Sequence, residues 1–268
     1  MDLEPHGIDT HVGVSPTYPW GRVYGGQVVA QGYVAAAKTV ESQYRIHSLH
    51  AYFIRGGDSD EPIRYEVDRI RNGRSFVTRR VVARQSNGAI LNLSASFQIE
   101  EDEPDSSTLS IPADTPHFDE LTDDTEPWTT FMDRRFVTSQ TPGGTSDDRA
   151  SAWTRLVGEL GDDPVMHAAG LAYVSDDYPT EAVRETHPLW REKAGGDDHH
   201  ELFSGASLDH SIWFHRPHRV TDWQLHDYRG SGVVGGRGLA IGNVFGAEGT
   251  HVATVAQEAL LRVNRKKR

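Results

Sequence analysis

Residues 207–216 read Ser-Leu-Asp-His-Ser-Ile-Trp-Phe-His-Arg and are typical of one β-strand, because Leu208, Ile212 and Phe214 alternate with polar side chains. Successive side chains of a strand point to opposite faces, so the odd-numbered residues from Ser207 to His215 are expected on one side. A polar set on one side of an aromatic-rich strand suits either a solvated face or a functional site. An earlier part of the chain helps to decide between them.

The end of this stretch has a counterpart in the first half of the chain. Trp213-Phe214-His215-Arg216 resembles Tyr52-Phe53-Ile54-Arg55 at a shift of 161 positions, and Glu248-Gly249 corresponds to Asn87-Gly88 at the same shift. Chance matches at two separate places would not share one register. The sequence therefore predicts a duplicated unit.

The first unit is predicted over residues 1–100, as an irregular N-terminal arm, one helix and four strands. Small and apolar residues recur every three or four positions over 28–37, which indicates a largely buried helix. Gly25 and Gly26 precede it and permit close approach of another backbone or a ligand. The strands are expected at 46–55, 63–70, 76–85 and 89–99, separated by Gly-Gly and Asn-Gly turns.

The second unit is predicted over residues 128–268, after an acidic, Pro-containing linker over 101–127. Its strand signals begin over 128–138 and 150–160, and its helix is expected over 165–174, with Asp163 as N-cap and Pro164 in the first turn. A polar insertion over 180–204 is followed by three predicted strands ending near Arg262. The fold class is thus α+β, with two tandem units, each a helix wrapped by an antiparallel sheet, packed as a pseudo-dimer.

The composition excludes several classes of protein. A net charge of −12 argues against nucleic-acid binding, which needs clustered positive charge. No run approaches the roughly 20 apolar residues that span a bilayer, and Met1–Gly7 lacks the form of a signal peptide. With no cysteine the chain has no disulfide and no thiol nucleophile, and we expect a cytoplasmic protein.

Two further motifs are expected to be structural. Asp197-Asp198-His199-His200 resembles a metal cluster, but adjacent residues do not readily converge on one ion, so a solvated loop and no metal site are predicted. Residues 230–235 spell G-x-G-x-x-G, yet strand-like residues follow where a dinucleotide fingerprint would open a helix. We expect a bend or bulge there.

Four ordered blocks resemble the type II acyl-CoA thioesterase family, whose members carry two hot-dog folds in one chain. The blocks are Arg22-Val23-Tyr24-Gly25-Gly26-Gln27, His47-Ser48-Leu49-His50-Ala51-Tyr52-Phe53, Asp209-His210-Ser211-Ile212-Trp213-Phe214-His215-Arg216 and Ala256-Gln257-Glu258. The resemblance spans about residues 20–262 and implies a double hot dog. It also implies hydrolysis of acyl-CoA to a free acid and CoA, with no metal or other cofactor.

The resemblance further implies a catalytic set of Asp176, Ser207 and Gln257, with the adjacent Asp177 as the alternative to Asp176. An Asp is a suitable general base for a water, and hydroxyl and amide groups can orient that water. Gly25, Gly26 and Gln27 are candidates for oxyanion donors through their backbone N–H groups. His50 is a further candidate for substrate binding, with a structural role in its strand as the alternative.

Two rival functions are open. A hot-dog enoyl-CoA hydratase would pair an Asp with a His five residues later, but Glu181 follows Asp176 and Ala182 follows Asp177 at that spacing. A silent acyl-CoA binding protein would be favoured by a broken catalytic set, and this set is intact by residue type. A duplicated hot dog satisfies the usual dimer internally, and further pairing of such chains into a homo-oligomer is open.

Overall fold

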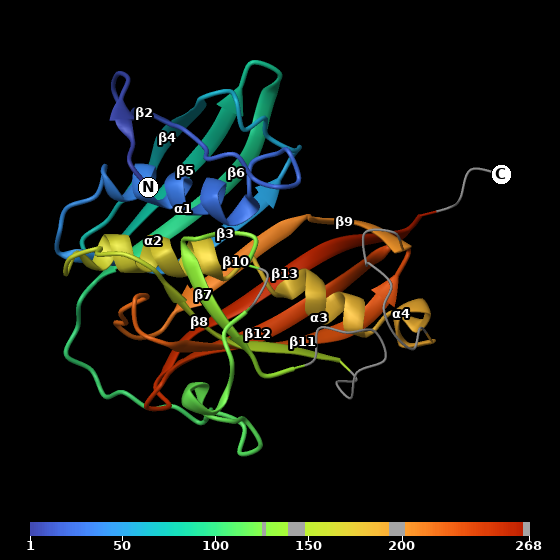
Figure 1. Ribbon diagram of the computed structural model, residues 1–268. Coiled ribbons are helices and arrows are strands. Elements are labelled where there is room, and N and C mark those ends of the chain that lie inside the picture. Colours follow the sequence, from blue (N-terminus) through green and yellow to red (C-terminus); the bar gives the residue numbers. More distant parts are fainter. Residues whose placement is uncertain (125–126, 139–147, 193–201, 265–268) are drawn as a thin grey trace.

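The computed structural model describes residues 1–124, 127–138, 148–192 and 202–264 (Figure 1). Its helices are α1 (Gly25–Ala37), α2 (Pro164–Val174), α3 (Pro179–Glu185) and α4 (Pro188–Glu192), with one 3-10 turn at Phe118–Glu120. Its strands are β1 (Glu4–Pro5), β2 (Thr10–Gly13), β3 (Tyr44–Phe53), β4 (Ile63–Asn72), β5 (Phe76–Gln85), β6 (Gly88–Ile99), β7 (Met132–Phe136), β8 (Arg149–Leu156), β9 (Phe203–Ser207), β10 (Asp209–Phe214), β11 (Gln224–Val234), β12 (Arg237–Gly246) and β13 (His251–Val263).

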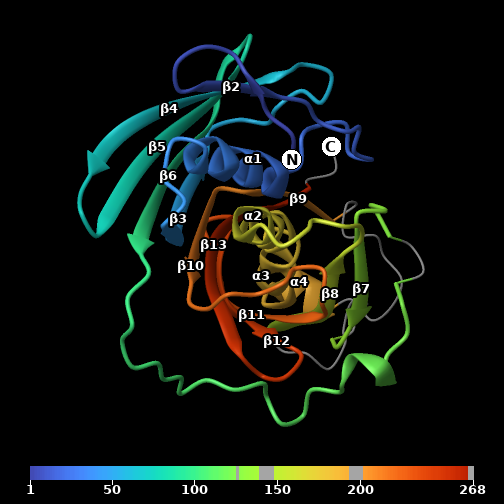
Figure 2. The ribbon, with the colours of Figure 1, turned by 90° about the vertical axis from the view of Figure 1, so that its left-hand side faces the viewer.

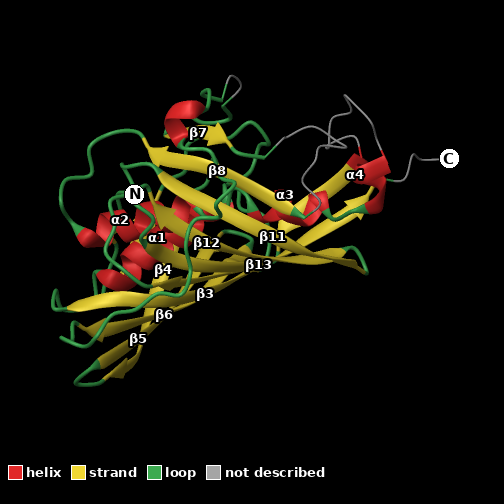
Figure 3. Ribbon diagram, turned by 90° about the horizontal axis from the view of Figure 1, so that it is seen from below, coloured by secondary structure: helices red, strands yellow, loops and turns green. Residues whose placement is uncertain are grey.

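The described strands form one antiparallel sheet that runs through both halves of the chain (Figure 3). Its order is β1-β2-β4-β5-β6-β3-β10-β13-β12-β11-β8-β7, and β9 also pairs with β13. The two halves meet where β3 pairs with β10. Figure 2 shows the sheet curving around α1 and α2, which lie side by side on its concave face. The predicted α+β architecture, in which helices are wrapped by an antiparallel sheet, is confirmed.

The junction of β3 and β10 confirms the duplication. Ser211 lies opposite His50 in the ladder, with a distance of 3.0 Å from its Oγ to His50 Nδ1, and these two residues are 161 positions apart. The junction is thus centred on two equivalent residues, as a pseudo-twofold axis requires. The hairpin glycines Gly88 and Gly249 share a positive φ, of 113° and 92°. Only glycine adopts such a backbone freely, so the same turn device recurs in both halves.

Close approach of α1 and α2 depends on a missing side chain. A Cβ on Gly26 would lie 2.2 Å from the carbonyl oxygen of Tyr173, so only glycine fits between the helices there. The rest of α1 consists mostly of small and apolar residues and is buried along nearly its whole length. The predicted N-cap of α2 is confirmed, since the Asp163 carboxylate accepts the Val165 backbone N–H at 2.9 Å.

The prediction of one strand over 207–216 is wrong. Ser207 pairs with Ala259 and Ser211 with Ala256, so four steps on one strand oppose three on its neighbour. This β-bulge at Leu208 separates β9 from β10 and reverses the alternation of side chains. Ser207 therefore does not share a face with the odd-numbered residues of β10; it points inward, on the side of the buried His210.

The C-terminal region also differs in detail from the prediction. Five described strands, not three, follow residue 202, because the Leu208 bulge divides one strand and the glycine-rich stretch contains a hairpin between β11 and β12. The predicted bulge over 230–235 is confirmed by a register shift between Gly230 and Val233. The segment 180–204 is less polar than expected, since α3 buries Ala182 and Val183 and α4 buries Trp190. Asp197–His200 lie outside the described residues.

Candidate active site

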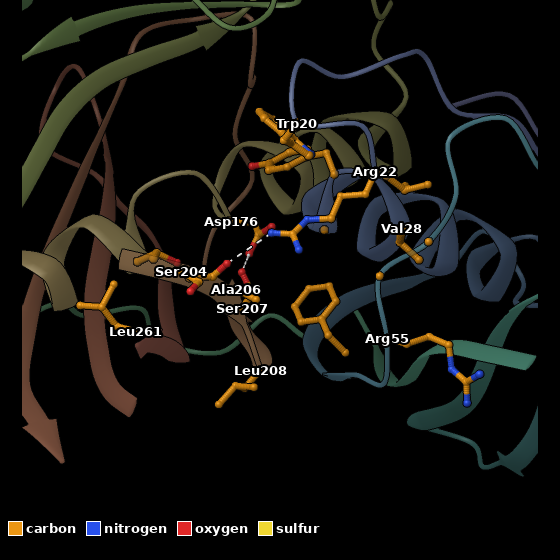
Figure 4. A pocket seen from close by; sticks show the side chains of 18 of the residues that line it. Trp20, Arg22, Val28, Arg55, Asp176, Ser204, Ala206, Ser207, Leu208 and Leu261 are labelled. Atoms are coloured by element: carbon orange, nitrogen blue, oxygen red, sulfur yellow. Dashed lines mark hydrogen bonds between the residues drawn. The ribbon is translucent and has the colours of Figure 1, made fainter. Parts of the chain in front are cut away.

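A cavity of about 730 Å³ lies between the two halves of the chain. The cavity lies beside β9. Within the described residues this strand pairs with β13 alone and with no strand of the first half. The approach to α1, the end of β3, the α2–α3 connection and β9 supply its walls (Figure 4). Arg22 spans the gap between halves, donating from Nη2 to the Gly205 carbonyl oxygen at 3.3 Å.

Three of the residues expected at the site are joined by hydrogen bonds. Ser207 Oγ donates to Asp176 Oδ1 at 2.9 Å, and Gln257 Nε2 donates to Ser207 Oγ at 2.9 Å. Asp176 comes from the end of α2, Ser207 from the end of β9 and Gln257 from the middle of β13. The inward turn at the Leu208 bulge is what brings Ser207 to the other two.

His210 extends this hydrogen-bonded chain into the core. Its Nδ1 pairs with Gln257 Oε1, and its Nε2 lies 2.9 Å from Ser175 Oγ. An amide oxygen only accepts, so Nδ1 carries the proton and Nε2 accepts from the serine hydroxyl. Burial lowers the pKa of His210 to about 4, which keeps the ring neutral. His210 thereby fixes the amide of Gln257 with its NH₂ group toward Ser207.

Asp176 is a buried carboxylate at the start of α1. It is only 6 % exposed, and the Gly26 backbone N–H donates to it. α1 has no side-chain cap, so its first N–H groups and positive dipole end face this carboxylate. Burial dominates over these favourable contacts and raises the pKa of Asp176 to about 7. At that value the group can take up and release a proton near neutrality.

Asp177 has a different environment, although it is adjacent and also lines the cavity. Its carboxylate accepts from Arg134 Nη1 at 2.9 Å and from Trp128 Nε1 at 3.0 Å. Arg134 is itself buried, so Asp177 compensates a charge in the interior. These contacts tie Asp177 to the packing of the second half.

The remaining predicted site residues divide into two groups. Gly25 lines the cavity, and a Cβ there would lie 2.5 Å from Asp176 Oδ2. Gln27 is absent from the cavity wall; its side chain holds the N-terminal arm, accepting from Tyr18 at 2.6 Å and donating to the Val14 carbonyl at 2.9 Å. His50 lies at the pseudo-twofold junction on the outer face of the sheet, away from the cavity. Neither side chain is placed to touch a molecule in the cavity.

His210 was not among the expected site residues, because one continuous strand over 207–216 would place it on the face opposite Ser207. The bulge removes that separation. Arg22, Glu181 and Arg184, which line the cavity, were also not singled out as site residues.

Both halves of the chain match models of one family. Residues 14–98 match the model described as acyl-CoA thioesterase N-terminal domain, and residues 105–261 match the acyl-CoA thioesterase C-terminal domain. The chain belongs to the acyl-CoA thioesterase family.

Relatives of this thioesterase extend over nearly its full length. It is 32 % identical to human acyl-coenzyme A thioesterase 8 over 98 % of this chain and 88 % of that protein. It is 31 % identical to acyl-CoA thioesterase 2 of Haemophilus influenzae, over 93 % and 91 %. The crystal structure of an acyl-CoA thioesterase II from Mycobacterium marinum superposes with a TM-score of 0.82 at 36 % identity, over 98 % and 96 %. The protein is a thioester hydrolase that acts on acyl-CoA.

A more distant structure bears on the fold alone. A hot-dog protein from Alicyclobacillus acidocaldarius superposes with a TM-score of 0.81 at 19 % identity, over 98 % of this chain and 97 % of that one. The double hot-dog architecture predicted for the thioesterase is confirmed.

The thioesterase has a second, smaller cavity of about 190 Å³ in the pseudo-equivalent position. Ile46, the counterpart of Ser207 at the shift of 161 positions, lines this smaller cavity. Ala37 at the end of α1 also lines it, much as Asp176 after α2 lines the larger one. The N-terminus of α2 is capped by the Asp163 side chain, whereas α1 has no side-chain cap and its Gly26 N–H donates to Asp176. Of these two cavities, only the larger carries the hydrogen-bonded chain.

Proposed function

We propose that this thioesterase hydrolyses acyl-CoA by direct attack of a water that Asp176 deprotonates and that Ser207 and Gln257 orient. The observation that supports it most is the buried carboxylate of Asp176, hydrogen-bonded to Ser207 at 2.9 Å and facing the cavity. A general base is most effective when its pKa lies near the working pH, and burial raises the pKa of Asp176 to about 7.

The reaction needs no covalent intermediate on the protein. The water oxygen forms a bond to the thioester carbonyl carbon while one water proton passes to Asp176. The carbon–sulfur bond then breaks, and the sulfur leaves with the electron pair and takes a proton to give CoA. The N-terminus of α1, where the Gly25 backbone lines the cavity, supports stabilisation of the developing oxyanion there.

Replacement of the proposed base tests this assignment. Asp176→Asn keeps the shape of the side chain but not its basicity, so we expect turnover to fall about 100-fold or more. The measurement is release of free thiol from acyl-CoA by the folded variant. Asp177→Asn provides the comparison. It removes one of the two carboxylate partners of the buried Arg134, so the unfolding temperature should fall while turnover changes little. Near-normal turnover in Asp176→Asn, with loss in Asp177→Asn, would transfer the role to Asp177.

The rival functions have separate signals. A silent acyl-CoA binding protein would bind substrate without releasing thiol, and a hydratase would remove the enoyl absorbance of crotonyl-CoA. The hydrogen-bonded set at Asp176 favours hydrolysis over both.

We also propose a cytoplasmic location and self-association. Within the described residues no helix is both long and apolar enough to cross a membrane.

The outer face of the sheet exposes Tyr52, Trp213 and Ile241 around the pseudo-twofold junction, which supports pairing of two chains through that face. Light scattering of the purified protein measures the resulting mass.

A further inference from the structure

The cavity extends to both sides of Asp176 and Ser207, with Arg55 on one side and Ser204 and Leu261 on the other (Figure 4). One side is lined by residues of the first half, including the exposed arginines Arg22 and Arg55. The other side runs along α3 and β9. Its lining there consists of Asp177, Thr180, Glu181, Arg184, Phe203, Ser204, Gly205, Ala206, Leu261 and Asn264.

This difference orients the substrate. The phosphates of CoA are attracted by exposed arginines and repelled by carboxylates. Arg55 stands on the first-half side, and Arg22 lies at the boundary, where it donates to the Gly205 carbonyl oxygen. The α3 side has Glu181 beside Arg184, and an Asp177 that is already paired with Arg134. In the arrangement proposed below, CoA lies over the first half and the acyl chain extends along α3.

The acyl side contains an incompletely paired Glu181 and Arg184. Their nearest oxygen and nitrogen atoms are 3.5 Å apart, which is long for a charged hydrogen bond. Within the described residues, Glu181 Oε2 and Arg184 Nε are buried and have no hydrogen-bond partner. Arg184 is 5 % exposed and is held by packing, with its guanidinium 4.7 Å from the centre of the Trp190 ring.

Buried polar groups without partners are costly, and their presence beside a cavity points to a ligand that completes them. A hydrocarbon chain cannot do so. A hydroxyl can, because it donates to a carboxylate and accepts from a guanidinium at once. A carboxylate on the chain would be repelled by Glu181 and an ammonium group by Arg184.

We propose that Glu181 and Arg184 select acyl-CoAs whose acyl chain bears a neutral hydrogen-bonding group, a hydroxyl above all, over plain hydrocarbon chains of equal length. This inference rests on the proposed function of the same cavity. It makes the α3 segment, which has no counterpart in the first half, the element that determines acyl specificity.

The test compares octanoyl-CoA with octanoyl-CoAs that carry one hydroxyl, moved along the chain carbon by carbon. For the wild type we expect kcat/KM for the best hydroxylated substrate to exceed that for octanoyl-CoA about tenfold, the worth of one hydrogen bond to a charged group. In Glu181→Leu/Arg184→Met, which removes both charges together and leaves neither unpaired, the ratio should fall to about one.

A matched control removes an exposed ion pair away from the cavity. Asp68→Leu/Arg80→Met does this on the outer face of β4 and β5 and should keep the wild-type ratio. A wild-type ratio of about one, or a ratio unchanged by the double substitution at Glu181 and Arg184, would overturn the proposal. A second test needs no turnover: the dissociation constants of non-hydrolysable thioether analogues, with and without the hydroxyl, should show the same preference and the same loss of it. Absence of thiol release from every substrate contradicts the proposed hydrolysis instead.

Discussion

Asp176 combines two opposing influences at one carboxyl group. The Ser207 hydroxyl and the Gly26 N–H favour its charged form, while burial disfavours that form more strongly. The result is a carboxyl that changes charge near neutral pH, and this has consequences for both activity and stability.

Activity should rise with pH through about 7. The base must be deprotonated to accept a proton from water, and burial raises the pKa of Asp176 to about 7. We expect kcat/KM to fall about tenfold per pH unit well below that value and to be flat just above it. A pH profile of thiol release at low substrate concentration measures this. A profile flat from pH 5 to 8 would contradict the assignment.

The same carboxyl links stability to pH in the opposite direction. Its pKa is higher in the folded protein than the 3.8 of an ordinary, solvated Asp, so the folded state binds the proton more tightly. This contribution to the free energy of unfolding is fully present below about pH 4 and is lost as the pH rises through about 7. In Asp176→Asn it should be absent, which urea unfolding at a series of pH values detects.

His210 is expected to act by positioning Gln257. His210→Phe keeps a ring in the core but removes the acceptor and donor that fix the amide. We expect kcat to fall about tenfold with KM nearly unchanged, since the ring does not line the cavity. His210→Gln, which can donate to the Gln257 oxygen, should recover part of kcat. Equal losses in both variants would indicate a purely structural role.

The residue types of the site were predictable, but their partners were not. Asp176, Ser207 and Gln257 were expected from the family resemblance, and the structure joins them by hydrogen bonds. The distinction between Asp176 and Asp177 depends on Arg134 and Trp128, which come from a distant part of the chain. No local pattern contains that information.

At the level of elements, α1, α2 and most strands followed from periodicity, whereas α3 and α4 in the expected polar insertion and β1 and β2 in the expected irregular arm did not. The strands β3 to β6 were located to within two residues, because Asn-Gly and Gly-Gly turns delimit them. The Leu208 bulge was missed because alternation continues unbroken through residues 207–216. A bulge adds one residue without changing the pattern of residue types, so it becomes visible only in the pairing with β13.

Substitution of the two adjacent glycines at the start of α1 should have different effects, one mainly on activity and the other mainly on stability. Gly25→Ala would place a Cβ 2.5 Å from Asp176 Oδ2, so we expect turnover to fall at least tenfold as the carboxylate is displaced. Gly26→Ala would place a Cβ 2.2 Å from a backbone oxygen of α2, and should lower the free energy of unfolding by roughly 1–3 kcal/mol. Thiol release and thermal unfolding of both variants give the comparison, and identical behaviour of the two would contradict it.

For the whole molecule, the duplication predicted the double architecture but not which of the two described cavities contains the hydrogen-bonded set. The larger cavity is distinguished by Asp176, by the start of α1, which has no side-chain cap of its own, and by the α3 segment. These features lie outside the repeated blocks, so comparing the blocks could not reveal them.

The junction of β3 and β10 makes the two halves separable in principle. If the chain is divided in the exposed segment near residue 103, each fragment retains its helix and loses one neighbour of its junction strand. We expect neither fragment alone to release thiol, because Gly25 and Gly26 reside in one and Asp176, Ser207 and Gln257 in the other. Mixing them should restore activity, whereas full activity of the C-terminal fragment alone would contradict the shared cavity. Fused to two other proteins, the fragments would then report by thiol release whether those proteins meet.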